Sequence, residues 1–145
     1  MSGYFIVSNA ESIALHAILS IASSPDRQVK IRDIAREYHF SEAHLAKVLN
    51  RLVKAGILRA TRGPSGGYRL ARAAQDITLY EIYCSIEGEL NGSRCMFRIP
   101  SCQGCRCPLG TFFDRISREI DEKLKQTRVS DIIAETGQAP ASPPA

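Results

Sequence analysis

The sequence lacks tryptophan, and it lacks any uncharged run long enough to cross a bilayer, which takes roughly 20 apolar residues. Its most apolar stretch, residues 5–22, carries Glu11 and His16 and has no basic residue before it. A secretory signal peptide begins with a basic segment, so this stretch is not predicted to be one. We therefore expect a cytoplasmic protein that does not insert into a membrane.

Acidic side chains are missing from one long part of the chain, since no Asp or Glu occurs between Glu42 and Asp76. Residues 1–72 hold 11 basic and 5 acidic side chains, a net charge of +6, whereas residues 73–145 hold 8 and 10, a net charge of −2. A solvated surface normally mixes signs, while a carboxylate next to phosphate weakens binding. This asymmetry favours a nucleic-acid-binding first half joined to a different second half.

The residue patterns of the common enzyme sites are also missing. The three histidines are scattered, and we find neither paired acids nor a Ser/His/Asp order. The glycine-rich stretch at residues 62–72, RGPSGGYRLAR, lacks the Gly-Lys-Ser or Gly-Lys-Thr ending of a nucleotide loop, and a strand-like segment follows it instead of a helix. We predict that the protein is not an enzyme and has no small-molecule substrate.

Cysteine is present but concentrated. Of five cysteines, four fall within 13 residues: Cys95, Cys102, Cys105 and Cys107. They lie in a segment of about 20 residues rich in Gly, Asn, Ser and Pro, which is unusually long for a loop without a function. Such a cluster favours a metal or redox site over a disulfide framework. An iron–sulfur cluster, a zinc site, a thiol–disulfide switch and unligated thiols all remain open at this point. Cys84 stands alone within a helical pattern, where a buried thiol is the simpler interpretation.

Apolar periodicity predicts three helices in the first half, near residues 8–23, 31–38 and 41–55, with Ser41 as the cap of the third and Gly56 ending it. Two short helices joined by a tight turn form a helix-turn-helix. The outer face of the third helix carries polar and basic residues: His44, Lys47, Asn50, Arg51 and Lys54. We predict that this helix enters the major groove of DNA.

The glycine-rich stretch then predicts a two-stranded wing. ILRATR and YRLAR have strand character, and Pro64 with two glycines supplies the turn between them. Four arginines lie on the wing or at its base: Arg59, Arg62, Arg69 and Arg72. A narrow minor groove attracts an inserted guanidinium, and Arg62 is the best candidate for that role.

The second half predicts a helix at residues 77–88 capped by Thr78, the cysteine segment, and a long helix after Pro108. The long helix has one apolar stripe: Leu109, Phe112, Phe113, Ile116, Ile120 and Leu124. Either the body of the domain or a second copy of the chain could cover this stripe. Helix-turn-helix proteins usually bind DNA as two-fold dimers, so we expect a homodimer. Residues 129–133 are expected to add one turn. The fold class is mainly α with a small β wing, divided as a winged-helix domain at 1–76, a helix–loop–helix part at 77–133 and a disordered tail at 134–145.

The order of these pieces resembles the iron–sulfur winged-helix regulators of the IscR/NsrR type over residues 8–133. Arg-Gly-Pro-Ser-Gly-Gly-Tyr in the wing is the most specific match, supported by Ile-Thr-Leu at 77–79 and Ile-Glu-Gly at 86–88. The resemblance implies a DNA-binding regulator, a repressor, whose affinity for operator DNA depends on a [2Fe–2S] or [4Fe–4S] cluster. The alternative is a cluster-free regulator with a zinc site or thiol switch on the same cysteines.

The resemblance also implies ligands and DNA contacts. Cluster ligands fall best on Cys95, Cys102 and Cys107, with Cys105 extra. In several members of the family the fourth ligand comes from the N-terminal helix of the other subunit. Ser12 stands where some members carry an acid, so the candidates here are Glu11, His16 and Cys105. At two positions of the third helix where the best-known relative has Glu and Gln, this sequence has Ala46 and Lys47, so a different operator is expected. Predicted DNA contacts are Ser41, His44, Lys47, Asn50, Arg51, Arg59, Arg62, Ser65, Gly66, Tyr68 and Arg69.

Overall fold

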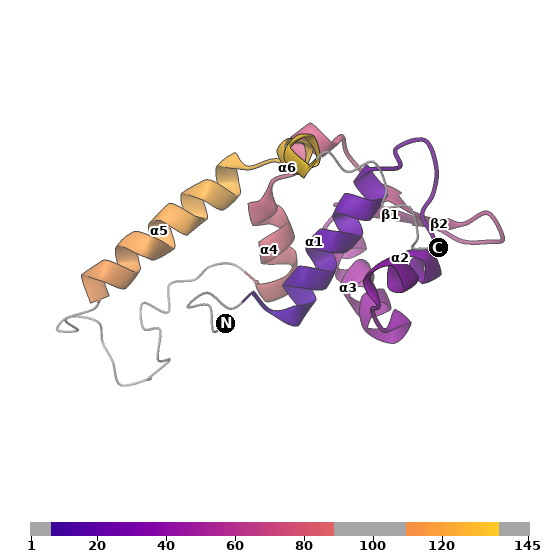
Figure 1. Ribbon diagram of the computed structural model, residues 1–145, viewed down its shortest axis with the longest axis horizontal. Coiled ribbons are helices and arrows are strands. Elements are labelled where there is room, and N and C mark those ends of the chain that lie inside the picture. Colours follow the sequence, from indigo (N-terminus) through magenta and orange to yellow (C-terminus); the bar gives the residue numbers. More distant parts are fainter. Residues whose placement is uncertain (1–6, 89–109, 137–145) are drawn as a thin grey trace.

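The computed structural model describes residues 7–88 and 110–136, which form a mainly helical fold with one two-stranded antiparallel sheet (Figure 1). Its elements in chain order are α1 (Asn9–Ala22), α2 (Ile31–Tyr38), α3 (Glu42–Lys54), β1 (Leu58–Thr61), β2 (Gly67–Leu70), the 3-10 turn η1 (Ala74–Asp76), α4 (Leu79–Glu87), α5 (Gly110–Gln126) and α6 (Val129–Thr136). The predicted fold class, a winged helix-turn-helix followed by a long helix, is confirmed. The predicted division into domains stays a prediction.

Helix α1 lies at the centre of the core. A capping box closes its N-terminus, because the Glu11 amide donates to Ser8 Oγ (3.1 Å) and the Ser8 amide donates to Glu11 Oε2 (2.6 Å). Five apolar side chains at helical spacing are then buried: Ile13, Ala14, Ala17, Ile18 and Ile21. Through them α1 packs against α3, α4 and strand β2.

The helix-turn-helix is formed by α2 and α3. Helix α2 ends at His39, whose φ of 57° is left-handed, and the Phe40 amide donates back to the Ala35 carbonyl (2.9 Å). Four residues of α3 face the core and are buried: Leu45, Val48, Leu49 and Leu52. Gly56, with φ +71°, follows α3 at the place the sequence predicts.

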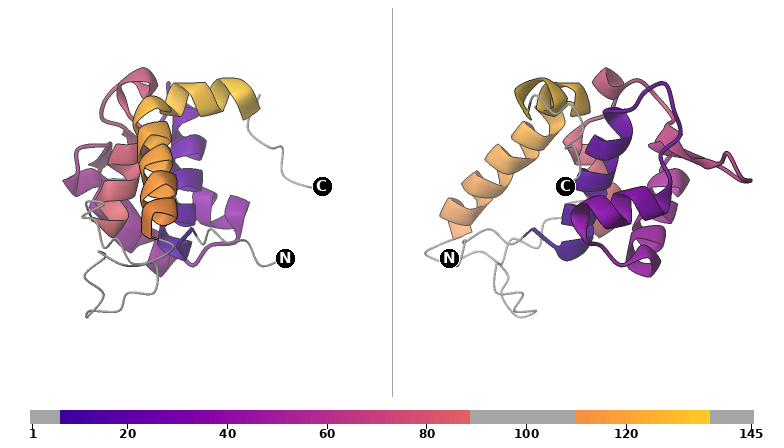
Figure 2. Two further views of the ribbon diagram at one scale, coloured as in Figure 1. Left: turned by 90° about the vertical axis from the view of Figure 1, so that its left-hand side faces the viewer. Right: turned by 45° about the vertical axis from the view of Figure 1, so that its right-hand side comes forward.

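The wing is the antiparallel pair β1–β2, with Leu58 opposite Leu70 and Thr61 opposite Gly67. The strand begins at Leu58 rather than at Ile57, which is itself buried. The wing protrudes from the helical body, as Figure 1 and the right-hand view of Figure 2 show.

The second half begins with α4, which Thr78 and Glu81 cap in the same manner as α1. Ile77 precedes this cap and so lies outside the helix in which the periodicity places it, yet it is buried. The segment before α4 pairs with the segment after α5: the Leu79 amide donates to the Thr127 carbonyl (3.0 Å), and the Val129 amide donates to the Ile77 carbonyl (3.0 Å). This pairing attaches the C-terminal end of α5 to the body.

Helix α6 is longer than the single turn predicted at 129–133. It continues to Thr136, so its last three residues overlap the predicted tail at 134–145; residues 137–145 lie outside the described part. The sequence pattern alone did not indicate that Val129 would be fully buried at the start of this helix.

Helix α5 extends from the body on the side opposite the wing (Figures 1 and 2). We call α1 to α4 with the wing the head, and α5 the arm. None of the arm's described side chains is buried, and Phe112 is 45% exposed. Near its C-terminal end, the arm contacts α4, where the Lys125 ammonium lies 4.6 Å from the centre of the Tyr80 ring. No described helix is long and apolar enough to cross a membrane.

Candidate nucleic-acid interface and cysteine segment

The outer face of α3 presents free hydrogen-bond donors. Lys47, Asn50 and Lys54 are exposed and His44 is half-exposed. Within the described ranges neither lysine forms an ion pair. Ser41 occupies the cap position before α3, but its side chain makes no capping hydrogen bond. The hydroxyl and the first amides of α3 are therefore available to an external phosphate.

Arg51 differs from its neighbours on α3. Its Nη1 donates to the Ile86 carbonyl at the end of α4 (2.9 Å). Arg51 was predicted to contact DNA because it lies on the outer face of the third helix. Arg51 is exposed like those neighbours, but its guanidinium also has an acceptor within the chain.

The outer face of the wing concentrates positive charge. Arg59 and Arg69 lie directly opposite each other in the strand register, and both are exposed. Like charges at opposed positions destabilise a sheet, and an anion lying against them would relieve this repulsion. Arg69 also donates from Nη2 to the Pro25 carbonyl (3.3 Å). Arg62 and Ser65 are exposed in the turn at the tip.

The two central glycines of the wing have steric roles. A Cβ at Gly66 would collide with the Thr61 carbonyl oxygen, and one at Gly67 would lie 2.7 Å from the Val29 carbonyl oxygen. Val29 approaches this closely because its amide and carbonyl both pair with those of Tyr68 (2.9 and 2.8 Å). The glycines thus form a tight turn and a close backbone contact, as in a hairpin, and no helix follows them.

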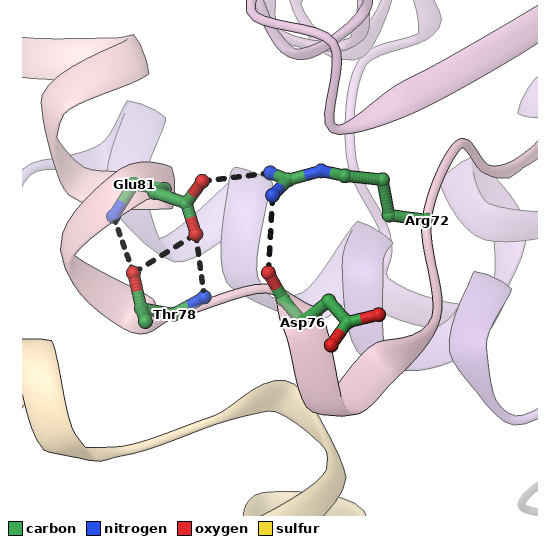
Figure 3. A network of polar contacts seen from close by, with 4 residues as sticks. All are labelled: Arg72, Asp76, Thr78 and Glu81. Atoms are coloured by element: carbon green, nitrogen blue, oxygen red, sulfur yellow. Dashed lines mark hydrogen bonds and ion pairs between the residues drawn. The ribbon is translucent and has the colours of Figure 1, made fainter.

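A polar network joins the base of the wing to α4 (Figure 3). Arg72 donates from Nη2 to Glu81 (2.7 Å) and from Nη1 to the Asp76 carbonyl (3.0 Å). Partial burial raises the pKa of Glu81, but hydrogen bonds from the Thr78 amide and from Arg72 outweigh it and hold that pKa below its usual range. The network fixes the strand leaving the wing to the start of α4.

The four clustered cysteines lie outside the described residues, as does the whole segment 89–109. Within the described ranges, no three His, Cys, Asp or Glu side chains gather as a metal site. The donor set itself fits an iron–sulfur cluster, because thiolates are the ligands that such clusters use. Cys84, in α4, is half-buried, and its thiol beside Tyr80 raises the pKa of the Tyr80 hydroxyl.

The ligand candidates on α1 already have partners. His16 Nδ1 donates to the Ser12 carbonyl (2.7 Å), which leaves only Nε2 for a metal. The imidazole packs edge-on against Tyr38 and Phe40, with ring centres 5.0 and 6.2 Å away. Burial in this cluster, with a neighbouring carboxylate, raises the pKa of Tyr38 to about 12. Glu11 is held in the capping box. The aromatic packing favours a structural role for His16.

One residue that supports the interface was not found from the sequence. Val29 pairs with Tyr68 and so connects the α1–α2 linker to the wing. The only indication of this pairing in the sequence is that Val29 is β-branched and lies between Pro25 and α2. Tyr68, predicted as a DNA contact, is half-buried and anchors the wing through this pairing.

Comparison with known proteins gives a family match over most of the chain. A family model described as "Rrf2: Iron-dependent Transcriptional regulator" matches residues 7–135. The relative named "Putative HTH-type transcriptional regulator BadM" from Rhodopseudomonas palustris is 48% identical over 73 residues, which are 50% of this chain and 47% of the relative. The chain therefore matches about half the length of that relative.

Two solved structures share the fold. The structure named "T. potens IscR" has a TM-score of 0.76 at 23% identity and covers 96% of this chain and 95% of its own. CymR of B. subtilis, described as a global cysteine regulator, has a TM-score of 0.75 at 21% identity and covers 90% of this chain and 98% of its own. At these identities the likeness concerns the fold alone, and it agrees with the winged-helix expectation.

Proposed function

The chain belongs to the Rrf2 family of iron-dependent transcriptional regulators, and on that premise we propose that it binds operator DNA as a homodimer and represses transcription under control of an iron–sulfur cluster. Members of this family are DNA-binding regulators rather than enzymes. The operator-binding residues, the dimer and the cluster are the parts of this proposal that need experiment.

The charge of the head surface carries the DNA-binding proposal. Exposed cations on α3 and the wing face outward, and the chain between Glu42 and Asp76 has no carboxylate to repel phosphate. The opposed pair Arg59 and Arg69 supports the same conclusion, since a nearby polyanion removes the repulsion between them. Neutralised phosphates release counterions and supply much of the affinity.

The parts of the head have separate roles in this proposal. Helix α3 enters the major groove, where Lys47 favours the O6 and N7 acceptors of guanine. Arg62 at the wing tip enters the minor groove, and Arg59 and Arg69 bind phosphates. Two heads joined through their arms read two half-sites about one helical turn apart.

Cysteines 95, 102 and 107 are the proposed cluster ligands, with Cys105 or a residue of α1 as the fourth. These residues would hold the cluster, which would cross-link the segment between α4 and α5 and change its charge. When the cross-link is lost, through iron shortage, oxygen or nitric oxide, the two heads lose the spacing that matches the half-sites. A tenfold loss of affinity needs a difference of only about 1.4 kcal/mol between the two states.

The test begins with protein purified without air. We expect visible absorption with matching iron and sulfide content, and binding to duplex DNA that weakens when the cluster is removed. Cys102→Ala should abolish the absorption, whereas the matched control Cys84→Ala should retain it because Cys84 lies within α4. Arg62→Ala should weaken DNA binding by about 1–3 kcal/mol with or without the cluster. The exposed arm residue Arg118→Ala provides its control.

Three results would contradict the proposal: a monomer in solution, no binding to duplex DNA at low salt, and no iron in the anaerobic protein. Retention of the full spectrum by Cys102→Ala would remove that residue from the ligand set. Each result removes a different part of the proposal.

A regulator without a cluster is the second candidate. The fold likeness to CymR, named as a cysteine regulator, favours it. A zinc protein would be colourless and contain stoichiometric zinc. A thiol switch would bind no metal, and its cysteines would titrate as free thiols only in the reduced form.

A further inference from the structure

The C-terminal end of α4 has an acceptor that its own helix cannot satisfy. The last carbonyls of any α-helix lack intrahelical donors, and that end carries a partial negative charge. The last turn of α4 contains no basic residue and ends in the acidic Glu87. The Ile86 side chain is in the core with 6% exposure. A cation from another element can therefore stabilise the end of α4.

Arg51 on α3 supplies that cation. Its Nη1 donates to the Ile86 carbonyl at 2.9 Å, a contact that joins residues 35 positions apart in the chain. A guanidinium is planar and always charged, so it stabilises both the carbonyl and the negative end of the helix dipole. The contact also fixes the C-terminal half of α3, because α3 continues for only three residues beyond Arg51.

A second helix meets the same turn of α4. Ser8 Oγ, in the cap of α1, donates to Glu87 Oε1 (2.6 Å). Helix α4 then stops at Gly88, whose φ is +86°. The C-terminal turn of α4 is thus in contact with both the start of α1 and the DNA-facing helix α3, and the chain leads from it directly towards the clustered cysteines.

We propose that Arg51 is a positioning residue that sets the orientation of α3 through the Ile86 carbonyl and does not itself contact DNA. This inference rests on the proposed function, because its effect is measured as operator affinity. It separates Arg51 from Lys47, one helical turn away, whose ammonium has no partner among the described residues and is free to reach DNA.

The first experiment needs no DNA. Backbone amide shifts are compared by NMR for Arg51→Met and for the matched control Lys47→Met. Loss of the contact should shift the amides of Glu87 and Gly88 in Arg51→Met and leave them unchanged in the control. If Arg51→Met leaves both amides unchanged, the contact with α4 is absent in solution and the proposal is wrong.

The second experiment measures operator affinity as a function of salt concentration. Arg51→Met should weaken binding about tenfold and leave the slope of log K against log salt unchanged, since no phosphate contact is lost. A phosphate-contacting residue lowers that slope by about 1 when it is removed, and a base contact relaxes preference at one position. Either of these effects in Arg51→Met would overturn the proposal, as would unchanged affinity.

The two experiments separate the possible failures. Wild-type protein that binds no duplex DNA would refute the proposed function while the NMR comparison still tests the Arg51 contact. Circular dichroism of Arg51→Met shows whether the head remains folded, and a melted variant is replaced by Arg51→Gln, which keeps a shorter donor.

Discussion

The head and the arm differ most in what covers their apolar residues. The head has a continuous core in which side chains such as Ile18, Leu49 and Ile77 are fully buried. The arm has a stripe of Phe112, Ile116, Ile120 and Leu124 that nothing in the described part buries completely. The apolar residues of the head are thus covered within the described chain, with Val129 of α6 completing the core, whereas the stripe of the arm needs a surface supplied from elsewhere.

The head and the arm also differ in whether their charged side chains are paired. On the arm, Lys125 pairs with Asp121 (2.6 Å) and Arg115 approaches Glu119 (3.8 Å), each four residues apart. Such mixed pairs are typical of a solvated helix face. The side of the head that we propose to face DNA has cations without matching acids between Glu42 and Asp76. A surface of mixed sign suits water, and a surface of one sign suits a partner of the opposite sign.

The largest effect is expected from a charge placed in the arm's apolar stripe. Ile120→Glu should convert the proposed homodimer to a monomer, because a buried unpaired carboxylate opposes association. Operator affinity should fall by a factor of 100 or more, on the order of 3 kcal/mol, as one of two half-sites is lost. Light scattering after size exclusion measures the mass, and fluorescence anisotropy measures the affinity.

The control for this change is Glu122→Lys, on the exposed side of the arm. It should leave both the mass and the affinity within about twofold of wild type. A dimer that persists in Ile120→Glu would mean that the stripe is covered by another part of the same chain.

A smaller effect is expected from a cavity in the head. Leu49→Ala removes a fully buried side chain and should lower the free energy of unfolding by about 2–5 kcal/mol. Urea denaturation followed by circular dichroism measures it, with the exposed Lys54→Ala within about 0.5 kcal/mol of wild type as control. In the Ile120→Glu background, the urea concentration at the unfolding midpoint should not depend on protein concentration. A concentration-dependent midpoint there would show that the head is not stable alone.

The smallest effect concerns the network at the base of the wing. The pKa of Glu81 is lowered in the folded state, so its stabilising contribution is complete above the ordinary carboxyl pKa of about 4.3 and is lost as the pH falls through the lower folded value. Because Arg72 and Glu81 are 40% and 38% exposed, their pair contributes only about 0.2–1 kcal/mol.

Glu81→Gln should remove that part of the acid dependence and leave the slope between pH 6 and 8 unchanged. Urea midpoints measured from pH 7 down to pH 3 provide the comparison. The exposed Glu119→Gln should keep the wild-type profile, and an identical profile for Glu81→Gln would show that the network has no effect on stability.

Local patterns predicted the helices of the head well. Leu45, Val48, Leu49 and Leu52 repeat at helical spacing and are buried as expected, and Gly56 ends α3 where a left-handed residue is needed. The wing turn was also predictable, because proline and glycine supply the backbone dihedral angles that a tight turn requires. These features depend on neighbours within a few residues.

Contacts between distant residues could not be predicted in the same way. A helical wheel places Arg51 on the outside of α3, but it gives no information about a carbonyl 35 residues later. The pairing of Val29 with Tyr68 and that of Ile77 with Val129 likewise join separate elements. The cysteine ligands and the DNA contacts stay predictions, since the first lie outside the described residues and the second need DNA.

The attachment of α5 at its C-terminal end gives the arm the mechanics of a lever. The hydrogen bonds between Ile77–Leu79 and Thr127–Val129 form a pivot, and the 17 residues of α5 extend about 25 Å from it at 1.5 Å per residue. A turn of about 10° at the pivot moves the far end, Gly110, by about 4 Å. Any small rotation at the body would thereby be magnified at the end of the arm that adjoins the cysteines in the chain.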